Sequence, residues 1–219
     1  MSFVEVEPAV TPRLRGVTHQ AAFFASLVAG SAIIAEAADG LPRLAATVFA
    51  ATVATMFAVS ALYHRVPWAS RTRPWMRRLD HACIYLLIAG SYTPYGLLAL
   101  EGSWRISVLA VVWTGAACGI AVRFAWVDAP AWVTVAVALP LGWFSVIAIP
   151  KAYGAMGLTG LSLLLAGGTL YSLGALVYAL RRPNPLPATL GFHEIFHLLV
   201  IAAVACQYAA VALIVLPAS

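Results

Sequence analysis

Seven stretches of about twenty mostly apolar residues dominate this chain and restrict what it can fold into. A helix needs about 20 apolar residues to cross the hydrocarbon core of a bilayer, and each stretch is close to that length. Only 10% of the residues are charged, against about 25% in soluble domains. We therefore expect an all-α polytopic membrane protein, a seven-transmembrane helix bundle. Residues 1–219 are expected to form a single domain, of which residues 1–16 are a cytoplasmic tail. The expected spans are 17–38, 43–63, 81–100, 104–124, 131–150, 158–180 and 193–216.

Short segments rich in Gly, Pro and charged residues separate the apolar stretches, as breakers do. Pro94, Pro140 and Pro150 fall inside or at the ends of spans, where we expect kinks. The expected separators are 39–42, 65–78, 101–102, 128–130, 150–157 and 183–187.

The basic residues predict which way the bundle lies in the membrane. If the N-terminus is cytoplasmic, ten of the thirteen basic residues fall on the inner side and only Arg43, Arg105 and Lys151 on the outer side. Cytoplasmic loops carry the excess of Lys and Arg in membrane proteins, so the N-terminus is predicted to be cytoplasmic. The net charge of +5 is thus explained by topology, and nucleic acid is not an expected partner. The inner set is Arg13, Arg15, Arg65, Arg71, Arg73, Arg77, Arg78, Arg123, Arg181 and Arg182.

The first stretch has a second interpretation. Arg13 and Arg15, then an apolar run, then Ala35, Glu36 and Ala37 resemble a signal peptide with its cleavage site. The apolar run is long for such a segment and serves equally well as a span, so we favour the span.

Five polar residues on three of the stretches are predicted to meet at one membrane depth. Ser60 and His64 end the second span, Asp80 opens the third helix, and His193 and His197 begin the last span. With a cytoplasmic N-terminus, all three of these ends face the cytosol. Residues four apart share a helix face, so each pair can point toward one place. Polar and ionisable groups are costly in a bilayer and usually functional there.

The residue types in this group suit a zinc ion. Three neutral imidazoles, from His64, His193 and His197, leave a fourth tetrahedral position open for water, as in catalytic zinc sites. Zinc lowers the pKa of such a water toward about 7. Asp80 and Ser60 can then hold the water or an outer-shell position by hydrogen bonds. Imidazole also suits other metals, so the ligands alone do not fix the ion.

Each of these residues also has a plainer interpretation. Singly, His64 can be an interfacial residue, Ser60 a packing residue and Asp80 a favourable charge in a helix's first turn. His193 and His197 can be an interfacial pair. All five residues are predicted to lie at the same depth in the membrane, and this favours a shared site.

Three further polar residues lie near the predicted site. His81 is about 100° around the helix from Asp80 and is expected to face elsewhere, as an outer-shell or interfacial residue. His19 begins the first span, and the sequence does not place it. His193 to His197 also match the HExxH pattern of zinc peptidases, with Glu194 as base. Glu194 is equally explained as an anion at a helix N-terminus.

The motifs together resemble the hemolysin III family, the bacterial branch of the progestin and adiponectin receptor family. They are Ser60 with His64, the run from Asp80 through Tyr85 and Gly90 to Pro94, and the final histidine pair. The resemblance implies seven spans in a bacterial plasma membrane, and zinc on His64, His193 and His197 with Asp80 at its water and Ser60 close by. Similar zinc sites occur in alkaline ceramidases, which cleave a sphingolipid amide.

The leading hypothesis is a zinc-dependent hydrolase of a lipid amide or ester at the inner leaflet. Asp80 would be the general base with Ser60 beside it, and a membrane lipid would be the substrate. The small residues expected to open space for an acyl chain include Gly90, Gly96, Gly167, Gly168 and Gly174. One alternative is a receptor or regulator in which zinc only joins helices. A further alternative is a cytolysin, although no amphipathic pore-forming segment is present. No protein partner is indicated.

Overall fold

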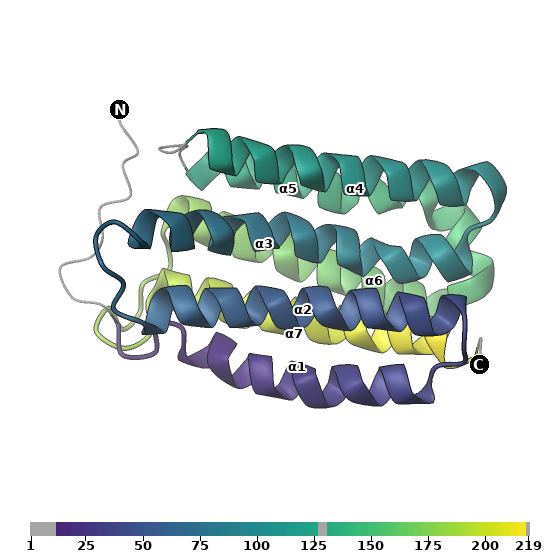
Figure 1. Cartoon of the computed structure of the whole chain (residues 1–219), viewed down its shortest axis with the longest axis horizontal. Helices are drawn as coiled ribbons and strands as arrows, with labels where there is room; N and C mark the ends of the chain where they lie inside the picture. The colour runs from purple at the N-terminus through teal and green to yellow at the C-terminus, as the bar shows by residue number, and fades with distance from the viewer. Residues whose placement is uncertain (1–11, 127–130, 218–219) are drawn as a thin grey trace.

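The computed structural model describes residues 12–126 and 131–217, and these residues form a bundle of α-helices. The helices run roughly along one axis (Figure 1). The predicted all-α class is therefore confirmed. The helices are α1 (Val17–Glu36), α2 (Leu41–Arg65), α3 (Arg73–Pro94), α4 (Gly102–Ala125), α5 (Ala131–Trp143), α6 (Ile149–Leu180) and α7 (Phe192–Val215), with a π-helical turn at Tyr95–Ala99 and a 3-10 turn at Phe144–Ala148.

Six of the helices in the described residues are long and apolar enough to cross a bilayer, namely α1, α2, α3 with its π turn, α4, α6 and α7. The fifth predicted span is shorter, because α5 ends at Trp143 and a 3-10 turn continues it to Ala148. The chain is a multi-pass membrane protein. The tail is described only from residue 12, and the separator 128–130 lies outside the described residues.

The third helix begins earlier than the predicted limit of residue 81. α3 starts at Arg73 with a proline in its first turn, a position that suits proline because its missing N–H is not needed there. Hydropathy marks only the apolar part of a helix, and α3 extends about two turns beyond it. Asp80 therefore lies two turns inside α3, so the predictions that it opens the helix and serves as a first-turn charge are wrong.

The predicted separator 150–157 is confirmed only at its end: residues 150–156 are helical, and the chain leaves helical geometry at Gly157, just before the predicted span 158–180. α6 begins at Ile149, with Pro150 in its first turn, and the break is reduced to Gly157, whose φ of 61° lies in the left-handed region. Glycine adopts this conformation without a steric cost. The other two prolines do mark changes of helix type, since Pro94 precedes the π turn and Pro140 the 3-10 turn.

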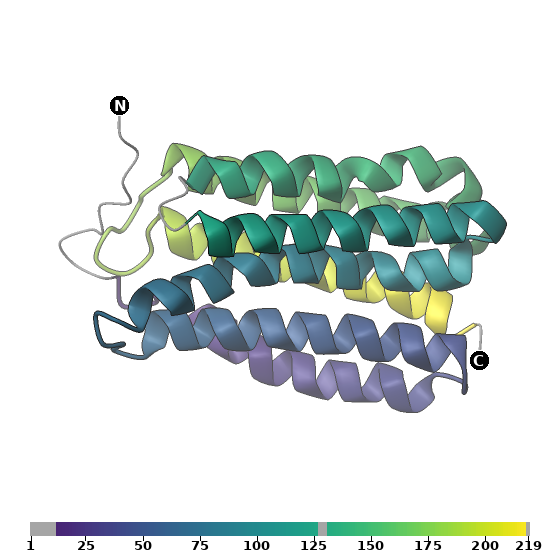
Figure 2. The ribbon, with the colours of Figure 1, turned by 45° about the horizontal axis from the view of Figure 1, so that its top comes forward.

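The ends that carry the predicted site residues lie together. The end of α2 and the starts of α1, α3 and α7 are all at the same end of the bundle in both views (Figures 1 and 2). α2 packs between α1 and α3, and α7 contacts α1, α2, α3 and α6. Large apolar side chains such as Phe49, Met56 and Phe57 are buried along α2. This packing places three site-bearing helices against one another.

Candidate metal centre

The three predicted histidines form a compact cluster. The Nε2 atoms of His64 and His193 are 3.2 Å apart. One ring nitrogen from each of His64, His193 and His197 lies within 4.8 Å of the other two. The one-turn spacing on α7 places His193 and His197 on the same face, with ring centroids 4.6 Å apart. All three side chains are at most 7% exposed.

This donor set fits a metal ion. In a tetrahedral site with zinc–nitrogen bonds of 2.0–2.1 Å, the ligand nitrogens lie roughly 3.3 Å apart, which matches the His64–His193 separation of 3.2 Å. A buried imidazole normally satisfies its ring nitrogens with hydrogen bonds or a metal. His197 Nδ1 is buried and has no hydrogen-bond partner within the described part of the chain. The three histidines can therefore hold a metal ion.

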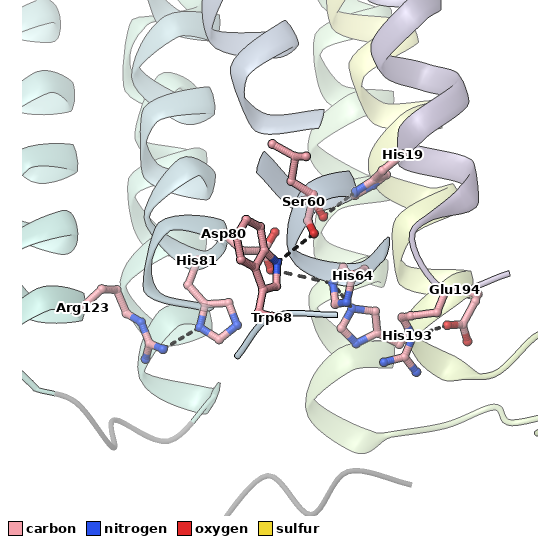
Figure 3. Close-up of polar contacts among 11 residues, drawn as sticks. His19, Ser60, His64, Trp68, Asp80, His81, Arg123, His193 and Glu194 are labelled. Atoms are coloured by element: carbon pink, nitrogen blue, oxygen red, sulfur yellow. Dashed lines mark hydrogen bonds and ion pairs between the residues drawn. The ribbon is translucent and has the colours of Figure 1, made fainter. Parts of the chain in front are cut away.

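Asp80 and Ser60 border the cluster. Asp80 Oδ2 is 3.8 Å from His64 Nε2, and its side chain is 13% exposed. Ser60 lies one turn before His64 on α2 and is buried. Both residues face the region of the histidines (Figure 3). The structure thus brings all five predicted residues together from α2, α3 and α7.

A fourth histidine joins this group from α1. His19 is 2% exposed, and its Nδ1 shares a 2.8 Å hydrogen bond with Ser60 Oγ (Figure 3). Its ring stacks on His197 with centroids 3.7 Å apart and planes 9° apart. The sequence left His19 unplaced, because a single polar residue near a span end has no periodic partner. The one feature of the sequence that could have indicated a functional role for His19 is that it is an ionisable residue inside an apolar helix.

Glu194 lies next to the cluster but is engaged elsewhere. Its Oε2 accepts a 2.8 Å hydrogen bond from the backbone N–H of Gly191, at the start of α7. Its other carboxylate oxygen pairs with Arg15. The side chain is 0% exposed. This geometry supports the helix N-terminal interpretation of Glu194 over the peptidase-like base.

The Arg15–Glu194 pair fastens the segment before α1 to the start of α7. The backbone N–H groups of Arg13 and Leu14 donate to the carbonyls of Ala188 and Thr189 at 3.0 and 3.3 Å. Glu194, which forms the pair with Arg15, is the residue next to His193 in the sequence. The pair therefore helps to set the position of the α7 end that carries the cluster.

We expect Arg15→Ala to lower the free energy of unfolding by about 3 kcal/mol, since removing one partner leaves a buried carboxylate uncompensated. Thermal unfolding in detergent would measure the loss. Arg13→Ala is the matched control, because Arg13 is exposed and attaches through its backbone. Adding Glu194→Gln to Arg15→Ala should restore part of the stability, and no restoration would show that the pair is not the cause.

His81 lies outside the histidine cluster, as expected, and lines the cavity beside Asp80. Arg123 Nη2 on α4 donates to His81 Nδ1 at 2.5 Å, and Figure 3 shows this pair apart from the histidines. His81 is buried rather than exposed at the membrane interface. Arg123 is itself 1% exposed. The pair joins α3 to α4.

An apolar cavity of about 190 Å³ runs from the cluster into the bundle. Its walls include His19, Ser60, Asp80, His193 and His197 at one end. Apolar side chains of α3, α5, α6 and α7 continue the walls along the bundle. The cavity is therefore open to the candidate metal site.

The glycines expected to create this space do not do so in general. A Cβ on Gly90 would lie 1.9 Å from Thr52 Oγ1, and one on Gly96 would lie 2.5 Å from Leu109 Cδ2. These glycines allow helices to touch. Of the glycines considered, Gly168 does line the cavity.

Comparison with known proteins places the chain in a family. Residues 9–208 match the Haemolysin-III related family. Hemolysin-3 of Bacillus cereus is 34% identical over 174 residues, which cover 80% of this chain and 76% of that protein. The Hemolysin-3 homolog of Bacillus subtilis (strain 168) is 33% identical over 136 residues, or 62% of this chain and 63% of that protein. The human monocyte to macrophage differentiation factor is 26% identical over 189 residues, or 84% and 76%. With its apolar helices, this chain is a multi-pass cell-membrane protein that belongs to the haemolysin III family.

Proposed function

We propose that this protein is a zinc-dependent hydrolase that cleaves an amide or ester bond of a membrane lipid at the cytoplasmic leaflet. The observation that carries the proposal is the opening of a three-histidine cluster into an apolar cavity. A polar reaction centre at one end and an apolar channel beyond it suit a lipid whose head is cleaved while its chain stays in the bundle.

His64, His193 and His197 would hold the zinc ion. Bound zinc supplies Lewis acidity, which polarises a carbonyl group and lowers the pKa of a water molecule. Three protein ligands leave the open position that catalytic zinc sites need. The stack of His19 on His197 and the Arg15–Glu194 attachment beside His193 support the two α7 ligands from outside.

Asp80 is the residue best placed to move a proton. Its Oδ2 lies 3.8 Å from His64 Nε2, so a water in front of the histidines is within its reach. The carboxylate would accept a proton from the attacking water and return it to the leaving nitrogen or oxygen. Ser60 Oγ, already bonded to His19, can offer a further hydrogen bond to the water or to the substrate carbonyl.

Asp80→Asn tests this assignment. We expect the variant to keep its zinc and to lose turnover by about 10²- to 10⁴-fold, the usual contribution of a general base. Metal content would be measured by mass spectrometry, and turnover by product release from N-acyl sphingoid bases, N-acyl ethanolamines and lysophospholipids. His81→Asn on the same helix is the matched control, because His81 pairs with Arg123 instead. Full turnover in Asp80→Asn would remove Asp80 from the mechanism.

Assays on the same purified protein would distinguish the hydrolase from two other functions. The histidines join α2 to α7, so a zinc ion with a purely structural role would bind without turnover of any lipid tested. The hemolysin name of the Bacillus relatives suggests lysis, which dye leakage from liposomes would detect. The apolar lining of the cavity supports a lipid-binding function over a conducting pore.

A further inference from the structure

The cavity has a second polar region, at the end away from the histidines. Tyr95 donates its hydroxyl hydrogen bond to Gln207 Oε1 at 2.9 Å. Both residues line the same cavity as the histidine cluster and are 7% and 6% exposed. Polar side chains are rare at membrane depth and tend to mark ligand or ion sites there.

Two more hydroxyl groups belong to this region. Ser91 is 8% exposed and Tyr171 lines the cavity from α6. Neither Ser91 Oγ nor Tyr171 Oη has a hydrogen-bond partner within the described residues, although both atoms are buried. A buried hydroxyl left without a partner costs about 1–3 kcal/mol. Two such hydroxyls in one cavity indicate that a ligand supplies the missing partner.

The four side chains come from three helices but face one place. Ser91 lies one turn before Tyr95, so the two share a face. Gly167 packs against Gln207, because a Cβ there would lie 2.9 Å from Gln207 Nε2. Tyr171 lies one turn after Gly167 on α6, and therefore on the same side of that helix. Ser91, Tyr95, Tyr171 and Gln207 are named the distal polar group below.

The distance between the two polar regions sets the kind of ligand. Along α7, His197 and Gln207 are ten residues apart, which is about 15 Å at 1.5 Å per residue. Along α3, Asp80 and Ser91 are eleven residues apart, or roughly 16 Å. The wall between them is mainly apolar. A ligand that satisfies both ends needs a polar head, about 15 Å of hydrocarbon, and a second hydrogen-bonding group.

We propose that the distal polar group recognises a hydroxyl on the hydrocarbon chain of a lipid whose head lies at the histidines. This inference rests on the proposed function only for the position of the head. Gln207 and the hydroxyls of Ser91 and Tyr171 offer both donors and acceptors, so a chain hydroxyl can donate and accept there. A hydrocarbon chain without a hydroxyl would leave those groups unpaired, and sites of this kind reject analogues that lack the hydroxyl.

Three fatty acids test the inference by displacement of tritiated octadecanoic acid from the purified protein in detergent. They are octadecanoic, 2-hydroxyoctadecanoic and 12-hydroxyoctadecanoic acid. The two hydroxy acids are isomers, so they control for micelle partitioning. The 12-hydroxyl lies about 14 Å from the carboxyl carbon in an extended chain, given carbon–carbon bonds of about 1.5 Å. We expect the 12-hydroxy acid to bind about tenfold more tightly than both others, as one or two hydrogen bonds would give.

Tyr171→Phe and Ser91→Ala should each reduce this preference to about threefold or less while octadecanoic acid binds as before. Tyr153→Phe is the matched control, because Tyr153 also lines the cavity from α6 but is 52% exposed and outside the distal polar group. Equal binding of the isomers, no binding of any acid, or a preference unchanged in both variants would overturn the inference. The assay needs no turnover, so a hydrolase that fails to act and a distal polar group that fails to discriminate give different results.

Discussion

Purified protein is expected to contain about one zinc ion per chain, and His64→Ala and His193→Ala are each expected to lose it. The two residues lie on different helices, and their Nε2 atoms are 3.2 Å apart. Removing either leaves two imidazoles, fewer than the three or four protein ligands of zinc sites. Changes to residues that only support a ligand cost 10- to 100-fold in affinity, so loss of a ligand should cost more. Mass spectrometry of the dialysed protein measures the zinc content.

The control for this experiment is His81→Ala. His81 is a buried histidine of the same end of the bundle, but it pairs with Arg123 and should leave the zinc content unchanged. Circular dichroism would confirm that each variant keeps its helices. A variant of His64 or His193 that stays folded and retains a full complement of zinc would contradict the site. If a different metal were found at one ion per chain, the predicted metal site would be supported and the predicted identity of the ion would be wrong.

The sequence was sufficient to predict the bundle and the meeting of the site residues. Hydropathy locates apolar helices because every spanning backbone must satisfy its own hydrogen bonds. The alternation of the chain across the membrane then brings the end of α2 and the start of α7 to one side. His64 and His193 lie in contact as that argument requires, although 129 positions separate them. The cytoplasmic location of this end stays a prediction from the loop charges.

Other features depend on packing that no local pattern records. Asp80 lies inside α3 because helical backbone continues past the apolar stretch into the polar boundary. Residues 150–156 form a helical segment instead of a loop, and Gly157 alone forms the kink between this segment and the rest of α6. His19 reaches the cluster through the packing of α1 on α2 and α7. Its contacts with Ser60 and His197 are both long-range, and a residue type alone cannot predict them.

Gly90→Ala is expected to destabilise the protein by about 3 kcal/mol, at the upper end of what overpacking costs. The added Cβ would lie 1.9 Å from Thr52 Oγ1 and 2.6 Å from Thr52 Cβ, so the helices α2 and α3 would have to move apart. Gly154→Ala is the matched control in a helix, because a Cβ there meets nothing within 4 Å. Thermal unfolding in detergent measures both.

A second substitution identifies the cause of that loss. Thr52→Gly removes the three heavy atoms that would lie nearest to the new methyl group, so Gly90→Ala should cost much less in the Thr52→Gly background than alone. Additive losses would mean that the contact between Gly90 and Thr52 does not set the spacing of α2 and α3. That spacing also sets the site, because His64 lies on α2 and Asp80 on α3, with 3.8 Å between Nε2 and Oδ2. Gly90→Ala should therefore reduce turnover more than zinc content, since the zinc ligands lie on α2 and α7 and the proposed base lies on α3.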